Sequence, residues 1–276
     1  MLTLDFSQKT VVIIGGTSGI NRGIAEAFAA AGARVAVASR NPQKVSDTVA
    51  ALQGHGAEAM GFVADVRDYD SLVKGLGEVA AAYGPFDVLI SGAAGNFPAL
   101  ANSMSPNGFK AVVDIDLLGT YHVLRAAHPH LRKPGASIIN ISAPQALLAM
   151  AGQAHVCAAK AGVDMITRTL ALEWGVEGIR INSVVPGPIE GTEGMRRLAP
   201  TPEILERCRQ SLPLRRMGVP EDVANVCLFL ASPLAGFIHG AVVPVDGGWL
   251  LGGYSAVAAE MEPLLRAMPP HRADKG

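Results

Sequence analysis

The sequence predicts an α/β fold of the doubly wound (Rossmann) type, a single domain built on a seven-stranded parallel sheet with helices on both faces. Short runs of β-branched residues alternate strictly with long stretches rich in alanine and leucine, which is typical of parallel strands covered by helices. Crossovers between parallel strands are right-handed, and with helices on both faces they give a doubly wound sheet. The chain has 276 residues, 49% of them apolar, which is enough for one large core, and no linker or repeat interrupts the alternation.

Each strand is predicted from a short β-branched run, and each helix from a longer stretch between two such runs. The predicted strands are Thr10–Ile14, Arg34–Ala38, Glu58–Val63, Phe86–Ile90, Ser137–Ile141, Ile179–Val184 and Ala241–Val245. The predicted helices are Ile20–Ala31, Pro42–Gln53, Tyr69–Tyr83, Asn107–His130, Gln153–Trp174 and Glu221–Leu230. Pro42 suits the first turn of its helix, because the backbone N–H that proline lacks would have no hydrogen-bond partner within the helix there. Gly175 is a natural helix stop.

Two segments fall outside this alternation. Residues 187–213 are rich in glycine and proline, a composition that indicates a mobile substrate lid rather than a packed element. Residues 252–276 contain Pro-Pro and mixed charges near their end, and we expect a C-terminal tail of undetermined order. The predicted domain therefore covers residues 1–251.

Composition and charge argue against several classes of protein. The formal net charge is −1, from 23 basic and 24 acidic residues, so a nucleic-acid-binding protein is not expected. No apolar run reaches the ~18 residues of a membrane-spanning helix, and Met1–Asp5 lacks the basic start of a signal peptide. Cys157, Cys208 and Cys227 are too widely spaced for a zinc site or a disulfide framework, so we predict no metal and a reducing cytoplasm.

The first strand runs directly into a glycine-rich turn that ends at Gly23. Between a first strand and a first helix, such a turn directs backbone amides and a helix N-terminus at a pyrophosphate. We therefore expect a dinucleotide cofactor here, with a purely structural turn as the alternative. The expected contacts are Gly15, Thr17, Ser18, Gly19 and Ile20.

The end of the second strand indicates which dinucleotide is bound. A site for NAD usually has an acidic residue at this point, which binds the ribose hydroxyls. Here the strand ends in Ser39-Arg40. Arg40 can instead form charge-assisted hydrogen bonds with a 2′-phosphate. The sequence therefore favours NADP(H), with an ordinary solvated arginine as the alternative.

Several separated motifs resemble the short-chain dehydrogenase/reductase superfamily over about residues 7–250. The motifs are Gly15-x-x-x-Gly19-Ile20, Asp65-Val66, Ala93-Ala94-Gly95 and Pro186-Gly187, after the first, third, fourth and sixth strands. The resemblance implies that the cofactor also contacts Asp65, Val66, Ser91, Ala93, Lys160, Pro186, Gly187, Ile189 and Thr192. It further implies a homo-oligomer, commonly a tetramer, joined through the helices Asn107–His130 and Gln153–Trp174.

The catalytic set that is usual in that superfamily is altered here. Lys160 fits the family's lysine, but Val156 stands where a tyrosine is expected four residues earlier. Ala143 takes the place of the serine, and Asp116 takes the place of the asparagine. Asn21 replaces a glycine that often follows Gly-Ile, which leaves the pose of the cofactor open.

These departures, together with further motifs, resemble the 2,4-dienoyl-CoA reductases, especially the peroxisomal type. The further motifs are Ala93–Phe97, Asp114–Asp116 with Gly119-Thr120, His155, Glu173–Gly175 and Pro186–Gly194. The implied activity is the NADPH-dependent reduction of 2,4-dienoyl-CoA to 3-enoyl-CoA in the β-oxidation of unsaturated fatty acids. The chain ends in Asp274-Lys275-Gly276 rather than in a peroxisomal address, so we expect a cytoplasmic location.

The missing tyrosine suits that reaction. Ketone reduction needs an acid beside the carbonyl oxygen, and Val156 cannot donate a proton. A conjugated dienoyl thioester instead needs donors for the charge on its oxygen, and a proton for carbon. We expect Lys160 to bind the nicotinamide ribose and Asp116 to hold the proton-donating water. The alternatives are a solvated helix lysine and a buried structural aspartate. We expect Phe97 and His155 to contact the acyl-CoA, with ordinary core residues as the alternative.

Two other functions stay open. The chain could reduce 3-oxoacyl thioesters or other carbonyl compounds with a relocated acid. It could also be a catalytically silent NADP(H)-binding protein, because three of the four usual catalytic residues are replaced.

Overall fold

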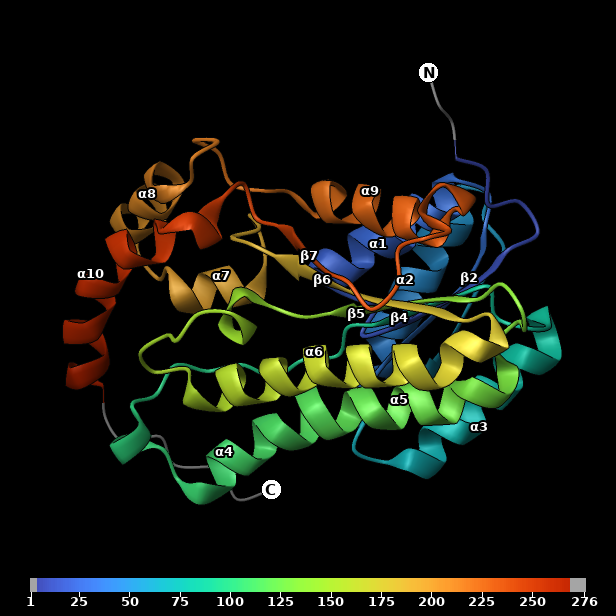
Figure 1. Cartoon of the computed structure of the whole chain (residues 1–276), viewed down its shortest axis with the longest axis horizontal. Coiled ribbons are helices and arrows are strands. Elements are labelled where there is room, and N and C mark those ends of the chain that lie inside the picture. Colours follow the sequence, from blue (N-terminus) through green and yellow to red (C-terminus); the bar gives the residue numbers. More distant parts are fainter. Residues whose placement is uncertain (1–3, 269–276) are drawn as a thin grey trace.

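The computed structural model describes residues 4–268 and confirms the predicted seven-stranded parallel sheet (Figure 1). The strands lie in the order β3-β2-β1-β4-β5-β6-β7. The chain moves outward from β1 to β3 and then returns past β1 to β4, which opens a crevice at the carboxyl ends of β1 and β4. The strands are β1 (Thr10–Ile14), β2 (Arg34–Ser39), β3 (Ala59–Val63), β4 (Val88–Ser91), β5 (Ser137–Ile141), β6 (Arg180–Pro186) and β7 (Val242–Val245).

Helices cover both faces of the sheet, as predicted: α1, α2 and α9 lie over one face, and α3, α5 and α6 over the other (Figure 1). The helices are α1 (Gly19–Ala30), α2 (Pro42–Gly54), α3 (Tyr69–Tyr83), α4 (Pro106–Val112), α5 (Gly119–Ala127), α6 (Ala154–Trp174), α7 (Glu193–Leu198), α8 (Pro202–Ser211), α9 (Pro220–Ala231) and α10 (Gly253–Ala267). With the exception described below, predicted elements end within two residues of the observed bounds.

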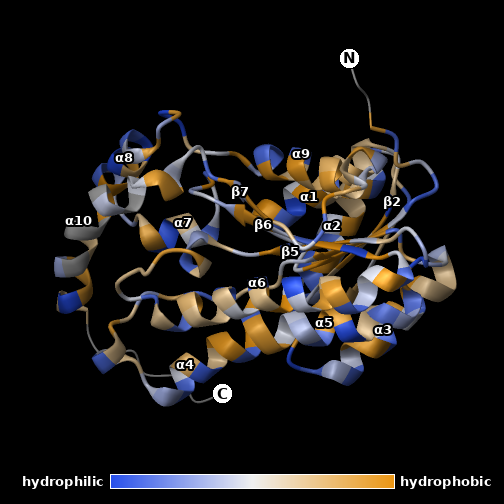
Figure 2. Cartoon of the chain, in the orientation of Figure 1, coloured by the Kyte–Doolittle hydropathy of each residue, from blue (hydrophilic) through white to orange (hydrophobic). Residues whose placement is uncertain are grey.

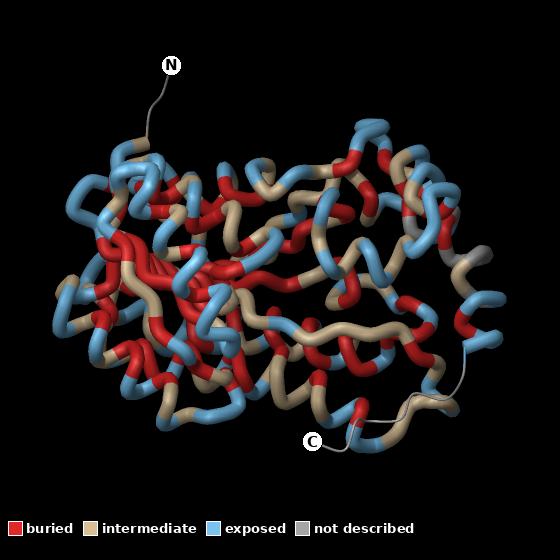
Figure 3. Tube along the Cα trace, turned by 180° about the vertical axis from the view of Figure 1, so that it is seen from behind, coloured by how far each residue is buried: buried red, intermediate tan, exposed pale blue. Residues whose placement is uncertain are grey.

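The core lies on both sides of the sheet, because successive side chains of a strand point to opposite faces. Val11 and Ile13 of β1 pack in the core with α1 and α9, whereas Val12 and Ile14 pack in the core with α3, α5 and α6. The central strands are therefore apolar (Figure 2) and buried (Figure 3), while the exposed segments lie toward the outside. This rigid base holds the loops at the carboxyl ends of the strands.

The predicted long helix over Asn107–His130 is confirmed as a continuous helical segment, but it is not a regular α-helix throughout. The chain forms α4, then a π-helical turn over Val113–Leu118, then α5, and it ends in a 3-10 turn. Within the π turn, the backbone carbonyl of Asp116 accepts a hydrogen bond from the Thr120 hydroxyl at 2.6 Å. A π turn inside a longer helix often marks a functional position, and here it carries Asp116.

Residues 187–213 are more ordered than their composition indicates. They contain α7 and α8, and α8 buries Ile204 and Cys208 in a small apolar cluster. The prediction that this lid is not a packed element is therefore wrong for α8. The proline that opens α8 and the capping hydroxyl of Thr201 explain the helix, because both favour a helix start.

The predicted C-terminal tail is helical over α10, which packs against α8. Residues 269–276 lie outside the described residues. Figure 1 shows α7, α8 and α10 together at one end of the molecule, beyond the strands. These three helices therefore cover the crevice at the end of the sheet.

Candidate active site

A cavity of about 1220 Å³ lies at the carboxyl ends of the strands, beneath α7, α8 and α10. Most of the site residues that the sequence predicts line this cavity, although they come from many separate segments. They are Gly15, Thr17, Ser18, Gly19, Ile20, Arg40, Asp65, Val66, Ala93, Asp116, Lys160, Pro186, Gly187, Ile189 and Thr192. The fold therefore brings the predicted cofactor residues and the predicted catalytic pair into one space.

At Gly15 the glycine-rich turn lies too close to the segment after β4 for a residue with a side chain. Gly15 has φ +82°, and a Cβ atom there would lie 2.9 Å from the backbone nitrogen of Ala93. Ser18, the residue before α1, makes no side-chain capping bond, so the first amides of α1 are available to a ligand. This cradle of amides at a helix N-terminus fits a pyrophosphate.

Asn21 fits the turn because Gly92 makes room for it. The Asn21 amide donates a 2.7 Å hydrogen bond to the carbonyl oxygen of Gly92. A Cβ atom at position 92 would lie 2.4 Å from that same side chain. Asn21 also lines the cavity. The asparagine thus ties α1 to the end of β4 rather than pushing them apart.

The end of β2 presents an available positive charge. Arg40 is exposed and lines the cavity, and no described residue forms an ion pair with it. The nearby Asp65 is already bound to Arg67 at 2.6 Å, and that hydrogen bond keeps the pKa of Asp65 below its usual range. Arg40 is therefore available to bind an anionic group.

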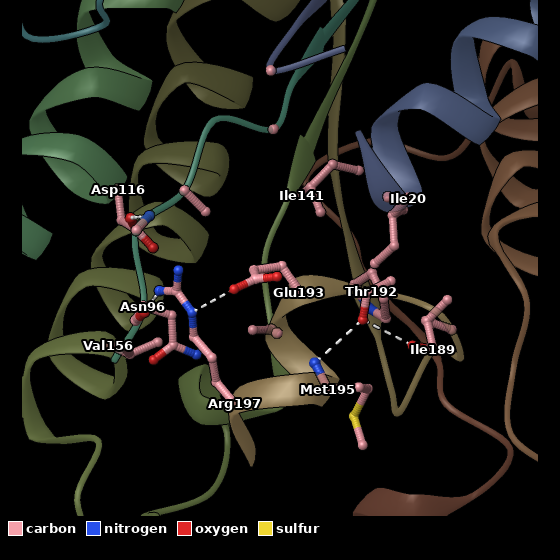
Figure 4. Close-up of a pocket in the computed structure, with 18 of the residues that line it drawn as sticks. Ile20, Asn96, Asp116, Ile141, Val156, Ile189, Thr192, Glu193, Met195 and Arg197 are labelled. Carbon is pink, nitrogen blue, oxygen red and sulfur yellow. Dashed lines mark hydrogen bonds and ion pairs between the residues drawn. The ribbon is translucent and has the colours of Figure 1, made fainter. Parts of the chain in front are cut away.

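A buried carboxylate and a buried ammonium group face each other at the centre of the site (Figure 4 shows Asp116). Asp116 Oδ1 accepts the Gly95 amide at 2.6 Å, and Asp116 Oδ2 lies 3.5 Å from Lys160 Nζ. Lys160 Nζ also donates to the carbonyl oxygen of Ile141 at 2.9 Å.

Burial dominates the electrostatics of this pair. It raises the pKa of Asp116, and the positive charge of Lys160 and the Gly95 amide offset this only in part. Asp116 Oδ2 accepts no hydrogen bond from any described residue. A buried carboxylate with a raised pKa, beside a buried ammonium group, is a candidate for a functional role.

The position of the missing tyrosine faces the same space. Val156 is buried, lines the cavity and packs against Val112 and Ala159. Ala143 lines the cavity as well. Neither side chain can donate a proton.

α7 is attached across the cavity to the loop after β4. The Arg197 guanidinium donates to the carbonyl oxygen of Asn96 and pairs with Glu193 at 3.0 Å (Figure 4). Thr192 caps α7, because its hydroxyl accepts the Met195 amide at 3.3 Å. No local pattern in the sequence predicts these contacts, because they join segments that lie far apart in the chain.

Three predicted site residues do not line the cavity. Ser91 is buried within β4, upstream of the turn that borders the cavity. His155 is fully buried, and its ring packs edge-on against Phe97 with centroids 4.5 Å apart. The ring of Phe109 in α4 also lies near His155, and the centroids of these two rings are 6.4 Å apart. Phe97 and His155 therefore form an aromatic pair beside the cavity rather than part of its wall.

Within residues 4–268, no helix is both long and apolar enough to cross a membrane. The same residues contain no cluster of three histidine, cysteine or acidic side chains that could hold a metal ion.

Comparison with known proteins supports a reductase. The family model that describes enoyl-(acyl carrier protein) reductase matches residues 15–250. The peroxisomal 2,4-dienoyl-CoA reductase of Arabidopsis thaliana, named as (3E)-enoyl-CoA-producing, is 41% identical over 253 residues, 88% of this chain and 85% of that protein. The probable 2,4-dienoyl-CoA reductase of Bacillus subtilis (strain 168), named as (2E)-enoyl-CoA-producing, is 40% identical over 250 residues, 90% of this chain and 98% of that protein.

A solved structure shares the fold. It is an NADPH-bound short-chain oxidoreductase from Pseudomonas aeruginosa PAO1 that contains an atypical catalytic center. The TM-score is 0.82 at 28% identity, and the alignment covers 88% of this chain and 97% of that chain.

Proposed function

The chain belongs to the short-chain dehydrogenase/reductase family, and from this premise we propose that it is an NADPH-dependent 2,4-dienoyl-CoA reductase. The proposed product is a 3-enoyl-CoA, and the proposed setting is the β-oxidation of unsaturated fatty acids. Relatives that are about 40% identical over most of the chain carry this activity in their names.

One observation carries the proposal: a buried Asp116–Lys160 pair faces the cavity, while the position of the family's tyrosine is Val156. Carbonyl reduction needs a protic group beside the carbonyl oxygen, and valine supplies none. Protonation of carbon has a different requirement, because the proton has to arrive at a carbon atom of the delocalised anion. An aspartate that holds a water molecule can meet that requirement.

In the proposed reaction, Lys160 and Asp116 have different roles. NADPH held in the cavity would supply hydride to the far end of the conjugated system, and the resulting negative charge would spread to the thioester oxygen. Lys160 binds the nicotinamide ribose and stabilises that charge in a site of low dielectric. Asp116 orients a water molecule, which gives a proton to the carbon next to the thioester, leaves the double bond at position 3 and regains a proton from solvent.

The cofactor assignment rests on two groups of residues. The amides that follow β1 fit the pyrophosphate, and the unpaired Arg40 fits a 2′-phosphate. Asp65, Val66, Ala93, Pro186, Gly187, Ile189 and Thr192 complete the proposed cofactor contacts. Ser91, Phe97 and His155 are positioned behind the cavity wall, so any role for them in binding is indirect.

The test is NADPH oxidation with a trans-2,trans-4-dienoyl-CoA and with a 3-oxoacyl-CoA in parallel. We expect rapid oxidation with the dienoyl thioester alone, and chromatography should identify a 3-enoyl-CoA. Oxidation with the oxoacyl thioester alone would overturn the proposal. The 2-enoyl isomer would preserve the activity but move the protonation to the fourth carbon, which matters because the two named relatives differ in their products.

We also propose a homo-oligomer that uses the helices α4, α5 and α6, which lie side by side along one edge of the molecule (Figure 1). These helices and the π turn expose the large apolar side chains Phe109, Leu118, Tyr121, Met165 and Leu172. Light scattering of the purified protein should give a tetramer, and a Leu172→Lys variant should weaken it. A monomer would contradict the proposal.

A cytoplasmic location stays a prediction. The Arabidopsis relative is named peroxisomal, and the Bacillus relative is named without a compartment. Fractionation of the source cells would test it.

A further inference from the structure

One face of α10 forms part of the cavity wall. Val257, Met261 and Leu265 all line the cavity, and they follow one another at intervals of four residues. Residues four apart lie on the same face of a helix. Val257 and Leu265 are buried there, whereas the neighbouring Leu264 is 43% exposed. The helix therefore presents an apolar stripe to the interior.

The stripe is fixed in place by its neighbours. Val257 and Met261 belong to an apolar cluster with Cys208 of α8 and with Trp249. Leu265 occupies a space that exists only because residue 152 is a glycine: a Cβ atom there would lie 2.8 Å from Leu265 Cδ1. These contacts hold α10 at the end of the cavity rather than at an arbitrary place on the surface.

This part of the cavity differs chemically from the rest. The lining residues around the glycine-rich turn include Gly15, Thr17, Ser18 and Gly19, and the centre carries Asp116 and Lys160. The lining residues under α8 and α10 are Met150, Cys208, Trp249, Val257, Met261 and Leu265. Methionine side chains adapt their shape to flexible apolar ligands. An alkyl chain is the ligand that such a wall suits.

The family match ends at residue 250, so α10 lies beyond the matched region. We propose that α10 is the end wall of an acyl-chain subsite, and that Val257, Met261 and Leu265 set the longest acyl chain the enzyme accepts. This inference rests on the proposed function for the identity of the substrate. It adds a residue-level determinant of chain length that lies outside the reacting centre.

The proposal gives a definite dependence on chain length. Each methylene group that leaves water for an apolar wall adds about fourfold to the affinity. The gain should continue until the chain reaches α10 and then stop. A larger side chain at position 261 should move this limit to shorter chains, and a smaller one should move it to longer chains.

The experiment compares three variants with the wild type across a series of trans-2,trans-4-dienoyl-CoA substrates of increasing acyl length. Met261→Trp narrows the end of the cavity, Met261→Ala widens it, and Leu264→Ala changes an exposed residue on the same helix. We expect Met261→Trp to lower kcat/KM about tenfold for the longest substrate that the wild type accepts, with little change for the shortest. Met261→Ala should extend the limit, and Leu264→Ala should behave as the wild type.

A binding measurement separates this inference from the proposed function. Trp249 lines the cavity, so its fluorescence in a Trp174→Phe background reports the binding of saturated acyl-CoA compounds, which cannot be reduced. If no dienoyl-CoA is reduced but the chain-length limit of binding moves with residue 261, the proposed function fails and the acyl subsite stands. If both Met261 variants keep the wild-type chain-length profile, or if no acyl-CoA binds, the proposal for α10 is wrong.

Discussion

Two buried aspartates stand at opposite edges of the sheet, and they differ in how completely they are bonded. Asp87 precedes β4 at the amino edge, and Asp116 lies in the π turn at the carboxyl edge. Both side chains are almost inaccessible to solvent. Their ionisation nevertheless shifts in opposite directions, because their partners differ.

At the amino edge, both oxygens of the Asp87 carboxylate have hydrogen-bond or charge partners. Asp87 accepts the Thr10 amide at 3.0 Å, and it pairs with Lys9 at 3.2 Å and with Arg132 at 2.6 Å. Burial acts to raise the pKa of Asp87, but these hydrogen bonds and charges outweigh it, so the pKa is lowered. Asp87 therefore ties β1, β4 and the segment before β5 together.

At the carboxyl edge, burial raises the pKa of Asp116, and one of its oxygens accepts no hydrogen bond from the described residues. A fully bonded buried carboxylate adds stability, whereas an incompletely bonded one is available for a ligand or a reaction. The same residue type thus stabilises the fold at one edge and, in the proposed function, takes part in the chemistry at the other.

Of the substitutions that test this comparison, we expect the one at Asp116 to have the largest effect, and that effect is on turnover. Asp116→Asn keeps an oxygen for the Gly95 amide but removes the charge that holds water and faces Lys160. We expect kcat to fall by about 10²–10⁴-fold, with the Kd of NADPH nearly unchanged. Stopped-flow reduction of a dienoyl-CoA and fluorescence titration of NADPH measure the two quantities. Asp114→Asn is the matched control, because Asp114 pairs instead with Lys110, and unchanged turnover in Asp116→Asn would make Asp116 structural.

The next effect concerns the other charge at the carboxyl edge. Arg40→Ala removes the proposed partner of the 2′-phosphate, and a charged hydrogen bond contributes about 1.5–3 kcal/mol. We therefore expect the KM for NADPH to rise about 10–150-fold, while the KM for NADH changes little. Arg22→Ala, which removes an arginine bound to Glu26, serves as the control. Equal changes for both cofactors would remove the assignment.

At the amino edge the expected effect is on stability alone. Asp87→Asn should lower the free energy of unfolding by about 1–3 kcal/mol, measured by urea titration, and should leave kcat unchanged. Because the pKa of Asp87 is lowered in the folded protein, ionisation favours folding. The stability advantage of the wild type over the variant should be constant above about pH 5 and should shrink as the pH falls below about 4. An advantage that grows on acidification would contradict the assignment.

The smallest effect tests packing at the carboxyl edge without any charge. Gly92→Ala places a Cβ atom against the Asn21 amide, and overpacking of this kind costs about 1–3 kcal/mol. The double variant Gly92→Ala, Asn21→Gly should recover most of that loss, since the obstructing side chain is gone. Thermal unfolding of the three variants measures the coupling, and additive losses would mean that the two residues do not share this space.

The sequence alone was sufficient for the sheet and for most helices, and most of the residues that it predicts to bind the cofactor line one cavity. Strands such as β1 and the turn at Gly15 can be predicted from a short stretch of sequence, because periodicity, β-branching and glycine conformations act over a few residues. The predictions for Arg40 and Lys160 have the same basis, because each residue stands at a fixed offset from a strand or a motif.

Only the tertiary structure decided how the helix that carries Asp116 is broken by a π turn, and that Phe97 and His155 pack against each other beside the cavity. It also decided that α10, which carries no motif, closes the apolar end of the cavity. These features depend on contacts between segments far apart in the chain, such as Leu265 with Gly152 and Arg197 with Asn96. Close packing fixes such contacts only when all the elements are assembled, so no local pattern in the sequence reports them.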